Sequence, residues 1–74
     1  MLRSLTPTEL AEVLEDSADR ATLQNFAEIR RVLRRRLAVE GIDHTLIWKA
    51  TLMDFQDGCR ELARQLRLDA LRRA

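Results

Sequence analysis

The chain has 74 residues, with 13 Lys and Arg against 12 Asp and Glu, a formal net charge of +1 and a pI near 8.0. That length suits a single domain over residues 1–74, and a core of this size usually needs a metal, disulfides or a partner chain for support. The single Cys59 excludes an internal disulfide, and together with the single His44 it cannot make a zinc site by itself. The nearly balanced charge is unlike that of a strongly basic nucleic-acid-binding domain.

Helix-forming residues dominate the sequence, which has only two glycines, one proline and no tyrosine. No apolar alternation typical of a strand occurs, so we predict an all-α fold. No apolar run approaches the roughly 20 residues that span a bilayer, and the N-terminus lacks the apolar stretch of a signal peptide. We therefore expect a cytoplasmic protein without a membrane span. All basic residues except Lys49 are arginine, a bias typical of GC-rich bacterial genomes.

The first helix start signal is Thr6-Pro7-Thr8-Glu9. Thr6 suits the N-cap, Pro7 the first helical position and Glu9 the third, and the flanking leucines form a hydrophobic staple. We predict a short helix over about 7–16. A cluster of capping residues at 16–19 favours a break there, although a continuous helix through it stays open.

A second helix is predicted over about 18–40, because Gly41 is well placed to end it. Apolar residues recur at helical spacing along this segment and predict its buried stripe. The stripe consists of Phe26, Ile29, Leu33 and Leu37.

A third helix is predicted over about 43–72, with Asp43 as its N-cap. The short link at 41–43 predicts that the second and third helices form an antiparallel hairpin, with the first helix packed beside it. Spacings of four and three along the third helix define an apolar seam. The seam consists of Trp48, Leu52, Phe55, Cys59, Leu62 and Leu66. Gly58 lies within it, where it either permits close backbone approach or kinks the helix.

No catalytic motif occurs in the sequence: there is no phosphate-binding loop, HExxH or CxxC, and no Ser-His-Asp arrangement. Asp43 precedes His44, but no nucleophile is identifiable near them, and an exposed residue in the first helical turn is the simpler interpretation of the histidine. Cys59 falls on the predicted core seam, which favours a buried and inert thiol. We predict a protein that is not an enzyme and has no cofactor or metal.

Five arginines gather in the second predicted helix, and four of them, Arg30, Arg31, Arg34 and Arg35, lie on or beside the face opposite its apolar stripe. Three interpretations stay open: a solvated face, a contact with an acidic partner or with the acidic first helix, and a contact with nucleic-acid phosphates. The cluster contains no interleaved aromatic residue to stack on bases, so nucleic acid is the less favoured ligand.

A second apolar group is predicted on the third helix, away from its seam. It consists of Leu46, Ala50, Met53, Leu68 and Leu71. A helix that is apolar on two faces usually lies between neighbours, and the short first helix could cover only part of so long a helix. We therefore predict that these residues bind another protein chain, either a second copy or a different helical partner.

The sequence thus predicts a helical interaction module, such as an adaptor, co-chaperone or assembly subunit. In size, in its two long helices joined by a tight turn and in Trp48 early in the second of them, the chain resembles the helical-hairpin co-chaperones of type III secretion needle subunits. That resemblance implies a heterodimer with a helical-repeat chaperone. The alternative is a dimeric nucleic-acid-associated regulator that presents the arginines of the second helix.

Overall fold

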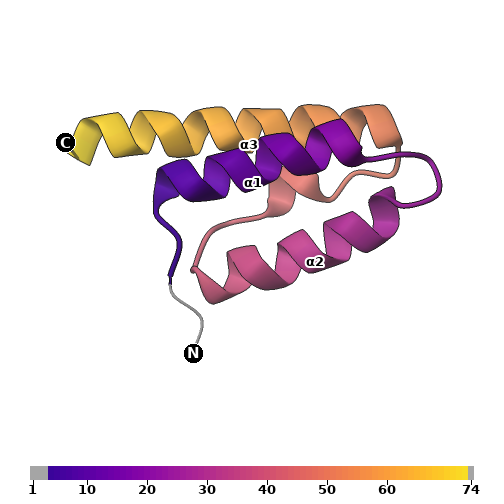
Figure 1. Ribbon diagram of the computed structural model, residues 1–74, viewed down its shortest axis with the longest axis horizontal. Coiled ribbons are helices and arrows are strands. Elements are labelled where there is room, and N and C mark those ends of the chain that lie inside the picture. The colour runs from indigo at the N-terminus through magenta and orange to yellow at the C-terminus, as the bar shows by residue number, and fades with distance from the viewer. Residues whose placement is uncertain (1–3, 74) are drawn as a thin grey trace.

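A computed structural model describes residues 4–73, and Figure 1 shows how its helices are arranged. The elements in chain order are α1 (Pro7–Arg20), α2 (Phe26–Val39), the 3₁₀ turn η1 (Thr45–Ile47) and α3 (Leu52–Arg73). The described residues contain no strand, so the predicted all-α class is confirmed.

The predicted start of α1 is confirmed, because Thr6 and Glu9 form the capping box with hydrogen bonds of 2.9 and 3.1 Å. The helix continues to Arg20, beyond the predicted end at 16. The capping residues in this stretch lie inside the helix, where Asp16 pairs with Arg20 at 3.1 Å. The break falls at 21–25 instead.

The second helix is shorter than the predicted 18–40, since α2 begins at Phe26 and ends at Val39. Gly41 does end it: its φ of 71° lies in the left-handed region that favours glycine. The amides of Gly41 and Ile42 donate to the carbonyls of Ala38 (3.0 Å) and Leu37 (2.9 Å), the pattern of a Schellman motif.

The predicted start of the third helix at 43 is wrong. The carboxylate of Asp43 accepts hydrogen bonds from the amide and hydroxyl of Thr45, at 2.9 and 2.6 Å, but only the single turn η1, with His44 at its N-cap position, follows it. The long helix α3 begins at Leu52, where the hydroxyl of Thr51 accepts a bond from the amide of Asp54 at 3.1 Å. Thr51 therefore provides the N-cap that the sequence interpretation assigned to Asp43.

The predicted hairpin of the second and third helices is not confirmed. In Figure 1, α2 and α3 run in the same general direction, and residues 40–51 return the chain between them. The helix that runs antiparallel to α3 is α1, and two ion pairs join them: Arg60 with Asp19 at 3.1 Å and Arg67 with Glu15 at 2.6 Å.

The core lies where α1, η1 and α3 meet, and α2 contributes two buried leucines. Its members are Leu10, Ala11, Leu14, Ala18, Ala21, Leu33, Leu37, Ile47, Phe55, Cys59, Leu62, Ala63 and Leu66. Most of the predicted seam is therefore buried. Leu52 is only partly buried, and Trp48, which precedes α3, is 42% exposed.

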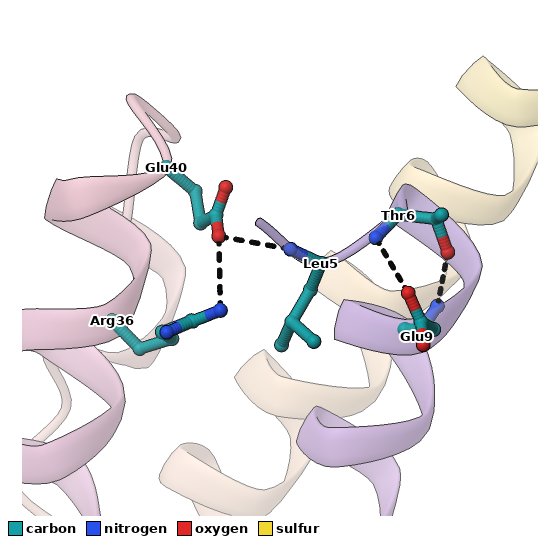
Figure 2. A network of polar contacts seen from close by, with 5 residues as sticks. All are labelled: Leu5, Thr6, Glu9, Arg36 and Glu40. Atoms are coloured by element: carbon teal, nitrogen blue, oxygen red, sulfur yellow. Dashed lines mark hydrogen bonds and ion pairs between the residues drawn. The ribbon is translucent and has the colours of Figure 1, made fainter. Parts of the chain in front are cut away.

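A small polar network ties the start of α1 to the end of α2 (Figure 2). One carboxylate oxygen of Glu40 accepts the backbone amide of Leu5 at 3.1 Å and the guanidinium of Arg36 at 3.2 Å. Leu5 packs against the core beside this bond. Through Glu40, the network connects the residues before α1 with the last turn of α2, which are far apart in sequence.

Candidate interaction surfaces

The arginine–tryptophan face consists of Arg30, Arg31, Arg34, Arg35 and Trp48. The guanidinium carbons of Arg30 and Arg34 lie 5.0 and 4.9 Å from the centre of the Trp48 ring. Both distances are within the range of cation–π attraction. The spacing of apolar residues predicts Trp48 on the core seam, and no aromatic residue is interleaved with the arginines in the sequence. The structure corrects this, because the non-helical segment before α3 folds back onto α2.

The centre of this face is held by several contacts. Arg30 also lies 5.6 Å from the ring centre of Phe26, and its guanidinium donates to the backbone carbonyl of Lys49. The indole N–H of Trp48 donates to Nδ1 of His44 at 2.9 Å. His44 thus holds the tryptophan, a role that the sequence interpretation did not assign to it.

The positive charge of this face is only partly compensated. Arg31 pairs with Glu28 at 3.4 Å, whereas Arg30, Arg34 and Arg35 have no acidic partner among residues 4–73. Three acids of α1 pair with arginines of α1 and α3 instead. The suggested pairing of the arginine cluster with the first helix is therefore not found within the described part of the chain.

The five residues predicted for partner contact do not share one helix face. Leu46 lies on η1, half-buried against the core, and Ala50 is exposed in the segment before α3. Both precede the start of α3, so helical spacing does not apply to them. Met53, Leu68 and Leu71 do lie on α3, with exposed fractions of 72%, 40% and 72%.

These three residues belong to what we call the outward face of α3, opposite its buried seam. The face consists of Met53, Asp57, Arg60, Glu61, Arg64, Leu68 and Leu71. Met53 and Leu68 are fifteen positions apart in sequence, about 22 Å along a helix at 1.5 Å per residue. The apolar residues therefore form two separate ends, with four charged residues between them.

A shallow groove of about 470 Å³ lies near the start of α1 and the end of α3. Its lining includes Leu5, Leu10, Ile42, Leu62 and Leu66, with Glu40, Asp43 and Asp69 among the polar lining residues.

The chemistry available to Cys59 is limited by burial. Its side chain is fully buried, and removal from water raises the pKa of the thiol from 9.0 to about 12. The thiolate, which is the reactive form, is therefore strongly disfavoured at neutral pH. Within residues 4–73, no three His, Cys, Asp or Glu side chains gather as metal ligands.

None of the helices described in residues 4–73 combines the length and apolar character needed to cross a bilayer. Comparison of the chain with protein-family models, with curated proteins and with solved structures finds no match.

Proposed function

We propose that the chain is a small helical interaction module that binds a partner protein chain through the outward face of α3. The observation that carries the proposal is the exposure of Met53, Leu68 and Leu71 on a helix that forms one edge of the molecule (Figure 1). Exposed apolar side chains at the two ends of one helix face are suited to contacts with another chain. A cytoplasmic and bacterial setting belongs to the same proposal.

Photo-crosslinking in cells tests this function. A photoreactive phenylalanine derivative replaces Leu71 in one variant and Val39 in a matched control, since Val39 is similarly exposed, at 80%, but lies on α2. We expect a protein adduct from position 71 and none from position 39. Absence of an adduct at 71, or equal adducts at both positions, would contradict the proposal.

The mass of the adduct separates the two kinds of partner. A species of two chains identifies a second copy, whereas another mass identifies a heteromeric partner such as a chaperone. The structure weakens the resemblance to needle co-chaperones, which relied on a tight turn between two long helices and on Trp48 within the second of them. Residues 40–51 separate α2 from α3, and Trp48 precedes α3.

A second candidate function is nucleic-acid binding through the arginine–tryptophan face. The position of Trp48 between two arginines favours it, because arginine and aromatic side chains together can contact phosphates and bases. Such binding must weaken steeply with added salt as counterions are released. A titration with a thymidine oligonucleotide, followed by the fluorescence of the single tryptophan, tests it at low and high salt. No response at low salt would exclude this candidate.

A further inference from the structure

The charges on the outward face of α3 follow a pattern that is complementary to itself. Along the helix the face presents Met53, Asp57, Arg60, Glu61, Arg64 and Leu68 in that order. When this order is read in reverse, an acidic residue takes the place of each basic one and a basic residue the place of each acidic one. The two apolar residues at the ends, Met53 and Leu68, exchange places. A second α3 lying antiparallel against the first would therefore meet matching chemistry.

The register of that pairing follows from the residue numbers. With a two-fold axis midway between positions 60 and 61, Met53 lies opposite Leu68 of the other copy. In the same register Asp57 lies opposite Arg64, whereas Arg60 and Glu61 lie on the two flanks of the axis. Each contact occurs twice by symmetry, as in any isologous interface.

We propose that the partner at this face is a second copy of the chain, bound antiparallel through α3 in this register. The inference rests on the function proposed above and names its partner. Apolar contacts at both ends provide the attraction, and the two pairs of Asp57 with Arg64 fix direction and register, which is the usual contribution of charges at an interface.

The side chains needed for this pairing are accessible in the single chain. Asp57 is exposed and makes no ion pair with any described residue. Arg64 pairs with Glu61 at 2.6 Å within its own helix, and Arg60 pairs with Asp19 at 3.1 Å. The side chains of both pairs are substantially exposed. Exposed pairs of this kind contribute little, so they can rearrange or extend into a network when another chain approaches.

Charge reversal tests the register. Asp57→Arg alone places like charges at both 57–64 contacts of the dimer, and so does Arg64→Asp alone. Each variant should self-associate at least about tenfold more weakly than the unaltered chain, because juxtaposed like charges are repulsive. An equimolar mixture of the two variants places opposite charges at both contacts and should associate again. Sedimentation velocity measures all three samples, with circular dichroism to check folding.

Recovery of association in the mixture, with neither variant associating alone, is the expected result. A mixture that stays monomeric while the unaltered chain dimerises would overturn the register. A monomeric unaltered chain would overturn the second-copy inference altogether. In that case a crosslink at position 71 to a different protein would still support the proposed function, whereas no crosslink would contradict both.

Discussion

The backbone carbonyl of Leu46 lies against Gly58, so that a Cβ atom at Gly58 would be 1.9 Å from the carbonyl oxygen. The atoms of η1 and α3 thus touch at a point where only glycine fits. Of the two roles considered for Gly58 from sequence, the close backbone approach is confirmed.

Gly58→Ala is therefore expected to destabilise the fold, although alanine favours a helix by about 1 kcal/mol over glycine. The new methyl group must displace η1, and overpacking of this kind costs about 1–3 kcal/mol. Urea unfolding followed by circular dichroism measures the change. Glu12→Ala, at an exposed position of α1 outside the proposed interface, is the control and should leave stability nearly unaltered. Equal or greater stability of Gly58→Ala would contradict the packing described here.

Helix termini that depend on capping residues close in sequence could be predicted from the sequence. The capping box at Thr6 and the left-handed Gly41 are local features, and both are where they were predicted. The start of α3 was missed because Asp43 and Thr51 are both capping residues, and spacing alone does not tell which one begins the longer helix. The Thr51-x-x-Asp54 pattern was the available signal.

The tertiary relationships were harder to predict. The contact between Trp48 and the arginines of α2 depends on a segment that reverses direction without an α-helix, and apolar periodicity gives no information about such a segment. The pairing of α3 with α1 rather than α2 likewise depends on the path of residues 40–51. Apolar spacing identified Met53, Leu68 and Leu71 as exposed positions of interest but wrongly added Leu46 and Ala50 to their helix.

Arg30→Ala should destabilise the protein by about 1–2 kcal/mol, because it removes contacts with two aromatic rings and a hydrogen bond to the carbonyl of Lys49. Arg35→Ala is the matched control, since Arg35 is exposed and has no ion-pair partner in the described chain. Only the first variant should alter the near-UV circular dichroism of Trp48, the single tryptophan. Identical spectra for both variants would count against the stacked arrangement.

Glu40→Ala should cost about 1–3 kcal/mol, because it leaves the Leu5 amide and the Arg36 guanidinium without this carboxylate acceptor (Figure 2). Glu28→Ala provides the comparison: it also breaks an Arg–Glu pair on α2, but the side chain of Glu28 is 69% exposed against 11% for Glu40. Its effect should stay within about 0.5 kcal/mol. Thermal unfolding of the two variants measures the difference, and similar losses would contradict it.

Alkaline pH should weaken the fold through Cys59. Burial raises the pKa of its thiol from 9.0 to about 12, so the unfolded chain releases this proton at a lower pH than the folded one. The contribution is fully present below pH 9.0 and is lost as the pH rises toward 12. Urea unfolding across this interval should show a steeper loss for the unaltered protein than for Cys59→Ala. Equal pH dependence in the two proteins would exclude a buried thiol as the cause.

The molar mass of the purified chain in solution, measured by light scattering across a dilution series, tests the interface on α3 most directly. The mass should approach twice the 8.6 kDa of one chain at high concentration and fall toward that value on dilution. Leu68→Asp should remain at the mass of one chain throughout, because it places a charge opposite Met53 of the other copy. A folded, unaltered chain that stays at 8.6 kDa at every concentration would contradict self-association through this face.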